Sequence, residues 1–311
     1  MKIVAFAGGV GGAKLAHGLA QILPPEDLTV IVNTGDDFEH YGLYICPDLD
    51  TVCYTLAGIA NPETGWGRAD EAWNAIENIS KLGGLDWFKL GDKDLGTHLE
   101  RTRRLKEGYS LSQITRDFCE VWGIQHTILP MSDRPVRTFV ETDEGELAFQ
   151  EYFVHRRCEP RIKGFWFDGI KQAKPARGSR EAIQSADAIV ICPSNPWVSI
   201  DPILKVFSDQ ESGWGDGKKV VAVSPIIGGQ AVKGPAAKMY RELGIEPSAL
   251  AVANHYRGLV THFVMDTIDA QLIESVRGLN MQVHVTKTVM KSHEDRKLLA
   301  ENTLNFLGSD L

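Results

Sequence analysis

The sequence predicts an α/β protein with a Rossmann-like, mainly parallel sheet, to which a helical insertion and a β-hairpin are added. Three observations support this prediction. A short apolar run at residues 2–7 leads into a glycine-rich loop and then into residues with helical spacing. A second apolar run at 28–32 completes a strand–helix–strand unit. Similar apolar runs alternate with helical stretches farther along the chain, as in a doubly wound sheet.

The first unit follows from its apolar residues, glycines and prolines. The strand expected at Lys2 to Ala7 ends in the glycine loop, residues 8–14, which reads Gly-Gly-Val-Gly-Gly-Ala-Lys. Leucine and isoleucine at positions 15, 19, 22 and 23 then recur with the period of a helix that buries one face. Prolines 24 and 25 end that helix, and the second strand is expected at Leu28 to Val32.

The middle of the chain has a different pattern. Residues 70–82 and 110–122 have helical periodicity, and we expect a helical insertion at about 60–125. Residues 136–154 alternate around the turn 143–145, which predicts an antiparallel hairpin. Further buried strands are expected at 188–192, 220–224 and 262–265. Because no long linker or repeat interrupts the chain, we predict a single α/β domain over residues 1–311.

The composition limits the kinds of function. The chain has 311 residues and a net charge of −8, which argues against a surface that binds nucleic acid. No run of 18 apolar residues is present, so we expect a cytoplasmic protein that does not bind a membrane. Its five cysteines are scattered and lack CxxC spacing, which argues against disulfides and structural zinc. An anionic ligand would therefore need local donors or a bound cation.

The glycine loop is typical of phosphate binding. Glycine lets backbone N–H groups approach phosphate oxygens at the positive end of a helix, and Lys14 adds a cation. A dinucleotide-binding loop would have its third glycine at Lys14, and an acidic residue where Asn33 closes the second strand. A Walker A loop would have Ser or Thr after the lysine, where this chain has Leu15. The remaining alternatives are a less common phosphate site or a tight turn without a ligand.

Four carboxylates follow the second strand, namely Asp36, Asp37, Asp48 and Asp50. Ligands of open α/β sheets lie beyond the carboxyl ends of the strands, so these groups and the glycine loop are expected to meet the same diphosphate. Carboxylates repel phosphate unless a hard cation such as Mg²⁺ lies between them. The alternative is that Asp50 only caps a helix and that Asp36 and Asp37 belong to a solvated turn.

Two more segments carry polar groups that could reach this site. Residues 89–98, which begin with Lys89, have alternating charges and are expected to interrupt the helices. They form either a solvated loop or a segment that binds an aromatic acceptor. Ser194 and Asn195 lie between two prolines directly after the strand expected at 188–192, and could bind a base or a ribose. The alternative for these two residues is a strand-end turn without a ligand.

Seven segments, in order and over nearly the whole chain, resemble the 2-phospho-L-lactate transferase family. They are the glycine loop, 33–37 (Asn-Thr-Gly-Asp-Asp), 45–51 (Ile-Cys-Pro-Asp-Leu-Asp-Thr), 90–94 (Leu-Gly-Asp-Lys-Asp), 129–133 (Leu-Pro-Met-Ser-Asp), 193–196 (Pro-Ser-Asn-Pro) and 224–228 (Ser-Pro-Ile-Ile-Gly). The most specific feature is 47–51 combined with 193–196. Residues 11–12, 65–67 and 73–74 look more like the bacterial branch, which is described as using a phosphoenolpyruvyl donor.

The resemblance implies transfer of phosphoenolpyruvate or 2-phospho-L-lactate from a guanosine diphospho-donor to the ribityl hydroxyl of the deazaflavin Fo, with release of GMP, in coenzyme F420 biosynthesis. It also suggests a homodimer. Asp36 and Asp50 would bind Mg²⁺ and act in catalysis, and Asp50 and Lys89 would bind Fo. The donor's diphosphate would be held by Gly9, Gly11, Gly12 and Lys14. Its guanosine would be held by Ser194 and Asn195.

Two other functions are compatible with parts of this pattern. A non-catalytic regulator that binds a nucleotide-sugar would share the first strand and the glycine loop. Such a regulator has no evident use for residues 47–51 or for Lys89. A nicotinamide-dependent dehydrogenase is disfavoured by Lys14 and Asn33.

Overall fold

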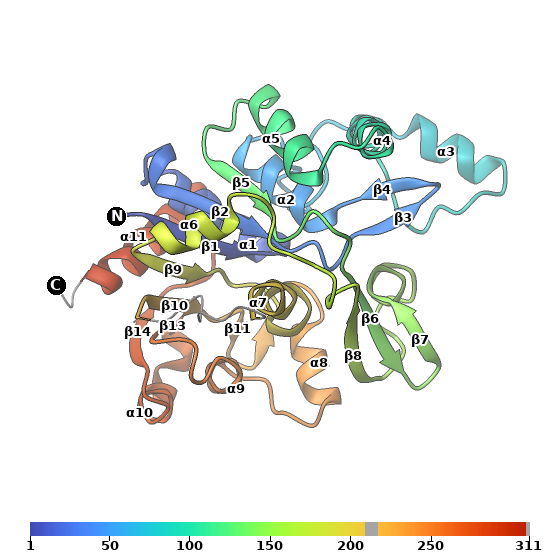
Figure 1. Ribbon diagram of the computed structural model, residues 1–311. Coiled ribbons are helices and arrows are strands. Elements are labelled where there is room, and N and C mark those ends of the chain that lie inside the picture. The colour runs from blue at the N-terminus through green and yellow to red at the C-terminus, as the bar shows by residue number, and fades with distance from the viewer. Residues whose placement is uncertain (209–216, 309–311) are drawn as a thin grey trace.

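The central sheet has seven strands, all parallel, in the order β14-β13-β10-β9-β1-β2-β5. The computed structural model describes residues 1–208 and 217–308, and Figure 1 shows the arrangement of its elements. This architecture confirms the predicted fold class. The strands are β1 (Ile3–Ala7), β2 (Leu28–Val32), β5 (Thr127–Pro130), β9 (Ala188–Ile191), β10 (Lys219–Val223), β13 (His262–Asp266) and β14 (Gln282–Thr286).

The five inner strands lie within one residue of their predicted positions. The two edge strands, β5 and β14, were not predicted. Fewer of their residues are buried, because an edge strand has a neighbour on one side only. The continuous apolar run that marks a central parallel strand is therefore missing from both.

Helices cover both faces of the sheet. On one face lie α1 (Gly9–Ala20), α2 (Pro47–Leu56), α5 (Leu111–Val121) and α11 (His293–Gly308); on the other lie α6 (Ser179–Ser185), α7 (Asp201–Ser208), α8 (Ala236–Glu242), α9 (Ala249–His255) and α10 (Ile273–Arg277). In β1, Ile3, Ala5 and Ala7 belong to the core on the first face, and Val4 and Phe6 to the core on the second. Burial on both sides explains why β1 is apolar throughout.

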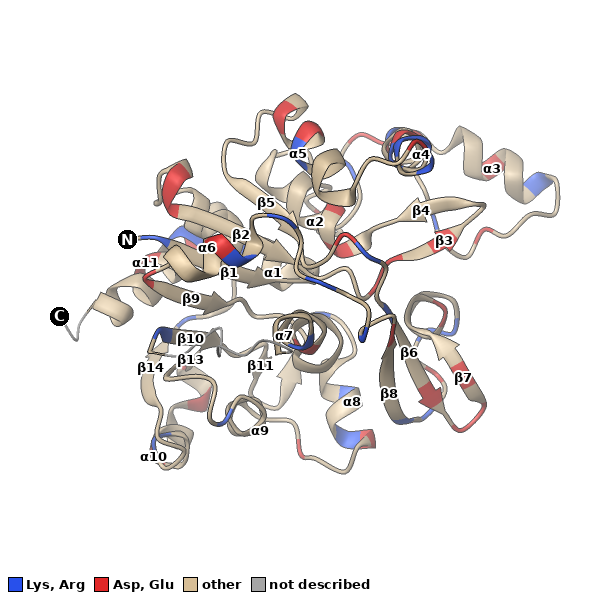
Figure 2. Cartoon of the chain, in the orientation of Figure 1, with Lys and Arg blue, Asp and Glu red and all other residues tan. Residues whose placement is uncertain are grey.

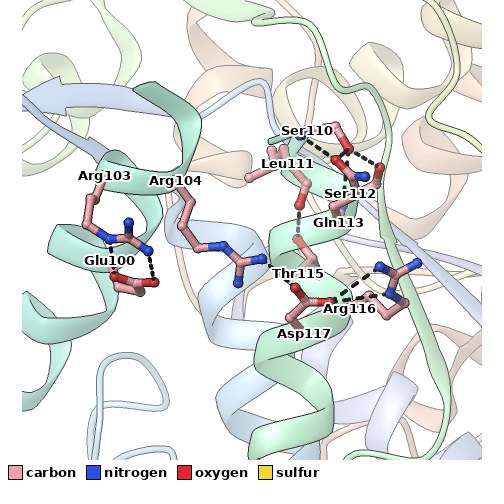
Figure 3. A network of polar contacts seen from close by, with 10 residues as sticks. All are labelled: Glu100, Arg103, Arg104, Ser110, Leu111, Ser112, Gln113, Thr115, Arg116 and Asp117. Atoms are coloured by element: carbon pink, nitrogen blue, oxygen red, sulfur yellow. Dashed lines mark hydrogen bonds and ion pairs between the residues drawn. The ribbon is translucent and has the colours of Figure 1, made fainter. Parts of the chain in front are cut away.

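The segment between α2 and β5 contains three helices, α3 (Asn74–Lys81), α4 (Asp92–Lys106) and α5. Charged residues gather on α4 and α5 (Figure 2). Figure 3 shows Arg104 of α4 reaching Asp117 of α5, and it shows Ser110 and Gln113 capping the first turn of α5. The Arg104–Asp117 contact fixes α4 to a helix that packs on the sheet.

Two predictions for this segment were wrong in detail. The helix expected at 70–82 begins only at Asn74, after Asp70 in a left-handed conformation with φ 52°. Residues 89–98 were expected to interrupt the helices, but α4 begins at Asp92 and His98 is buried. Asp92 and Asp94 lie in the first turn, where the helix dipole favours negative charge, so these alternating charges are compatible with a helix.

The hairpin predicted at 136–154 is confirmed only in its first part. β6 (Arg137–Thr142) and β7 (Gly145–Ala148) pair antiparallel around the expected turn. Residues Glu151–His155 then form a π-helical turn, and Phe149 stacks on Phe153 four residues later, which is helical rather than strand spacing. A third strand that was not predicted, β8 (Ile162–Asp168), pairs with the other edge of β6.

Short elements complete the fold. They are the hairpins β3 (Phe38–His40) with β4 (Leu43–Ile45) and β11 (Ile226–Ile227) with β12 (Gln230–Ala231), the 3₁₀ turns Pro25–Asp27 and Thr267–Leu272, and the π-helical turn Pro196–Ile200. Figure 1 shows β3–β4 and the β6–β8 sheet at the end of the molecule away from the N-terminus. Within the described ranges, no helix has the length and apolar character needed to cross a membrane.

Candidate active site

The strand order reverses between β1 and β9. From β1 the chain continues to β2 on one side, and from β9 to β10 on the other, which leaves a crevice at their carboxyl ends. A cavity of about 750 Å³ lies at this point. It is lined by the loops that follow β1, β9 and β10, as expected for a ligand site in an open α/β sheet.

The glycine loop forms one wall of the cavity. Gly9, Gly11 and Lys14 line it, and α1 begins at Gly9. The first N–H groups of a helix have no partner within the helix. In α1 that of Gly9 donates to Asp48, which leaves those that follow it for an anion. A Cβ atom on Gly11 would lie 2.3 Å from the carbonyl oxygen of Pro193, so only glycine allows the loops after β1 and β9 to approach this closely.

Two of the predicted nucleotide-binding residues, Gly12 and Ser194, also hold these loops together, and a third, Asn195, bonds within its own loop. Gly12 does not line the cavity, because its Cα faces the Ser194 hydroxyl and Ala7. The Ser194 hydroxyl accepts from Gly8 N at 3.1 Å and donates to Gly8 O at 2.8 Å. Asn195 Oδ1 accepts from Trp197 N at 3.1 Å. Ser194 and Asn195 still line the cavity, but their side chains already have partners.

Lys14 lies at the same wall, with its ammonium 2.8 Å from the carbonyl oxygen of Met290. Burial lowers the pKa of Lys14, and the nearby charges of Arg296 and Lys233 lower it further. A negatively charged ligand would reverse this trend, because it favours the protonated amine.

Three of the four predicted carboxylates, Asp36, Asp48 and Asp50, line the cavity, and Asp37 is buried outside it. Asn33 donates from Nδ2 to Asp48 at 2.9 Å. In the described part of the chain, Asp36 Oδ1 is buried without a hydrogen-bond partner. Burial raises the pKa of Asp36 well above its ordinary value, and the charge of Asp48 raises it further. It is therefore unfavourable for Asp36 and Asp48 both to be ionised without a cation between them.

The raised pKa of Asp48 predicts how stability depends on pH. Burial raises this pKa from 3.8 to about 6, so the folded protein keeps a proton that the unfolded chain has already lost. The folded state thus loses stability as the pH rises from about 4 to about 6, by about 1.4 kcal/mol for each pKa unit of difference. We expect Asp48→Asn to have a shallower slope than the wild type in urea unfolding without divalent cations, because burial also raises the pKa values of Asp36 and Asp37, which keep part of the slope. Parallel curves of stability against pH for the two proteins would contradict the prediction.

Asp50 is held by a buried arginine. Arg101 of α4 donates from Nη1 to Asp50 Oδ2 at 3.0 Å and from Nη2 to the other oxygen. Its side chain is only 2% exposed. Burial raises the pKa of Asp50, and the Arg101 charge opposes that rise. A buried guanidinium therefore lies directly behind Asp50, which itself lines the cavity.

His98 connects this pair to Asp94. Arginine can only donate, so the 3.1 Å contact from Arg101 Nη1 makes His98 Nδ1 the acceptor. The imidazole proton is then on Nε2, which lies 3.3 Å from Asp94 Oδ1. Asp50, Asp94 and His98 are close enough together to bind a metal, but the Arg101 guanidinium already supplies positive charge there.

Part of the cavity wall is aromatic. Its aromatic residues are Tyr54, Trp66, Trp87, Phe88, Phe149 and Phe153. Trp87 is stacked on His155 with ring centroids 5.2 Å apart, and Lys89 lines the cavity directly after this segment. Such a wall suits a flat aromatic ligand.

Neither the roles of Arg101 and Asp94 nor the aromatic wall were predicted from the sequence. Asp94, His98 and Arg101 are separated by four and three residues, which places them on one face of α4. This signal was present in the sequence, but it becomes visible only when residues 92–106 are recognised as a helix.

Comparisons with known proteins give four results. The chain matches the family model described as "2-phospho-L-lactate transferase CofD" over residues 3–304. It is 44% identical over 310 residues to a Streptomyces griseus protein named phosphoenolpyruvate transferase, with 98% of each chain covered. It is 39% identical over 302 residues to a Methanosarcina barkeri protein named 2-phospho-L-lactate transferase, with 96% of each covered. The crystal structure of a UPF0052-family protein from Bacillus halodurans has the same fold, with a TM-score of 0.62 at 16% identity over 97% of this chain and 98% of that one.

Proposed function

This chain belongs to the 2-phospho-L-lactate transferase family, and we propose that it transfers a phospho-three-carbon acid from a guanosine diphospho-donor to the ribityl hydroxyl of Fo, in coenzyme F420 biosynthesis. The hydroxyl oxygen bonds to the phosphorus that carries the acid, the bond from that phosphorus to the bridging oxygen breaks, and GMP leaves. We favour enolpyruvate over lactate as the acid, because identity is 44% to the Streptomyces griseus protein and 39% to the Methanosarcina barkeri protein.

The observation that carries this proposal is that a phosphate-type loop, a group of carboxylates and an aromatic wall line one cavity. We assign the donor diphosphate to Lys14 and to the backbone of Gly9 and Gly11. Gly12 contributes by letting α1 approach Ser194. The guanosine is assigned to the loop that contains Ser194 and Asn195.

The carboxylates fit a divalent cation. Asp36 has a buried oxygen without a partner among the described residues, and the charge of Asp48 raises its pKa. A hard cation with oxygen ligands would relieve both conditions. Asp50 was predicted as a ligand together with Asp36, but both of its oxygens accept from Arg101. We therefore propose Asp36 and Asp48 as the main ligands; bound Mg²⁺ would neutralise charge on the diphosphate.

We assign the acceptor to the aromatic part of the cavity. Trp87 and Phe88 would contact the deazaflavin, Lys89 would hold its polar groups, and Asp50 would accept the proton of the attacking hydroxyl. Arg101 fixes both oxygens of Asp50 for this purpose. In phosphoryl transfer a protein mainly positions the reactants and neutralises charge, so no covalent nucleophile is required.

The proposal is tested by incubating the protein with Fo, Mg²⁺ and either the enolpyruvyl or the lactyl ester of GDP. We expect GMP and the corresponding phosphodiester of Fo by mass spectrometry, and no product after chelation with EDTA. The absence of product with either donor, combined with tight binding of a nucleotide-sugar, would overturn the proposal. It would favour the non-catalytic regulator instead.

A further inference from the structure

Lys233 is a basic residue of the cavity that the proposed transfer does not yet use. Within the described residues, three lysines and no arginine line the cavity, namely Lys14, Lys89 and Lys233. Lys14 is assigned to the diphosphate and Lys89 to the acceptor. The third lysine has no role in the transfer as proposed so far.

Lys233 is held beside the glycine loop. It follows the β11–β12 hairpin. A hydrogen bond of 3.1 Å from Gly228 N to the Asp269 carboxylate anchors the turn of that hairpin. Lys233 Nζ donates to the carbonyl oxygen of Thr64 at 2.5 Å. A Cβ built on the neighbouring Gly65 would lie 2.7 Å from Val10 Cγ1 and 3.3 Å from Lys233 Nζ. The ammonium and the side chain of Val10, the residue between Gly9 and Gly11, therefore both lie beside Gly65.

Two ammonium groups beside the glycine loop form no ion pair among the described residues. Lys14 and Lys233 each donate to a main-chain carbonyl, and neither has a carboxylate partner in the described part of the chain. The two ammonium groups are close enough for the charge of Lys233 to act on Lys14. Two unpaired cations on one wall, in a chain of net charge −8, suit a ligand that carries more than one anionic group.

We propose that Lys233 binds the carboxylate of the three-carbon acid, while Lys14 and the glycine-loop amides hold the diphosphate. This inference rests on the proposed transferase function, in which the donor carries both kinds of anion. A hydrogen bond from an ammonium to a carboxylate is stronger than one to a neutral carbonyl, so Lys233 exchanges the Thr64 oxygen for the ligand. Lys233 thereby selects donors that carry an acid, and it serves lactyl and enolpyruvyl donors alike.

Binding of three ligands to the full chain tests this inference, by calorimetry with Mg²⁺ and without Fo. The ligands are GDP, GDP esterified on its terminal phosphate with lactate, and the isopropyl ester, in which a methyl group replaces the carboxylate. We expect the wild-type protein to bind the lactyl ester roughly 10- to 100-fold more tightly than the isopropyl ester. Lys233→Met should lose this preference with its affinities for GDP and the isopropyl ester unchanged, and Lys233→Arg should keep most of it.

Lys218→Met is the matched control. Lys218 also donates to main-chain carbonyls, those of Gln184 and Ala186, but it precedes β10 at the opposite end of the strand from the cavity. This variant should bind all three ligands as the wild type does. Equal weakening of all three ligands by Lys233→Met, or an unchanged preference for the lactyl ester, would overturn the inference. Failure of the wild-type protein to bind any of the three would instead overturn the proposed function itself.

Discussion

Replacing Arg101 by methionine is expected to lower the free energy of unfolding by about 3–5 kcal/mol, the usual cost of removing one partner of a buried ion pair. Arg101 is among the largest fully buried side chains, and Asp50 is 5% exposed. Methionine keeps much of the side-chain volume, so the loss would come from the charge rather than from a cavity. Urea unfolding without ligand at neutral pH measures the effect.

Arg103→Met on the same helix is the control. Arg103 forms ion pairs with Glu100 and Glu107, but its side chain is 55% exposed (Figure 3 shows the Glu100 pair). Exposed pairs contribute about 0–1 kcal/mol, so this variant should be nearly as stable as the wild type. Adding Asp50→Asn to Arg101→Met should recover part of the stability, because it removes the unpaired carboxylate. Equal losses in the Arg101 and Arg103 variants would contradict the prediction.

Turnover of Asp50→Asn is expected to fall by about 10²–10⁴-fold at saturating Mg²⁺, the range for loss of a general base. Asparagine has nearly the same shape as aspartate, but its amide does not accept the proton of the attacking hydroxyl. The measurement is the rate of GMP release with Fo, with the Mg²⁺ concentration raised until the rate no longer changes.

Two controls separate catalysis from folding. Asp27→Asn, directly before β2 at the end of that strand opposite the cavity, should turn over at the wild-type rate. Calorimetry of Asp50→Asn with GDP should show that the donor side of the site is intact. Near-native turnover would remove Asp50 from the catalytic residues. Recovery of the rate by additional Mg²⁺ alone would make Asp50 a metal ligand rather than a base.

The fold was predictable from the sequence because its inner strands are buried on both faces. Such strands are continuous apolar runs, and glycine or proline follows several of them. The same rule places ligand groups beyond the carboxyl ends of the strands, so residues as distant as Lys14, Asp36 and Ser194 could be expected in one cavity. The edge strands β5 and β14 have no comparable signal.

The pairing of charges inside the site was not predictable in this way. Asp36 and Asp50 appear equivalent in the sequence, but one has an oxygen without a partner among the described residues and the other is held by Arg101, 51 residues farther on. That contact depends on how α4 packs. The first turns of α4 lie within residues 89–98, which were predicted to interrupt the helices because of their alternating charges. Likewise, no local pattern indicates that the Ser194 hydroxyl is paired with Gly8.

The paired hydrogen bonds between Gly8 and Ser194 also bear on how the protein folds. The two residues are 186 positions apart, and β1 has β9 as one of its two neighbours in the sheet. β1 and its loop are synthesised before β9, but they cannot reach their final environment until the chain has been made beyond Ser194. Contacts between such distant segments form slowly, because a long stretch of chain must be ordered first. The phosphate loop is therefore completed only after Ser194 has been made, long after the loop's own glycines.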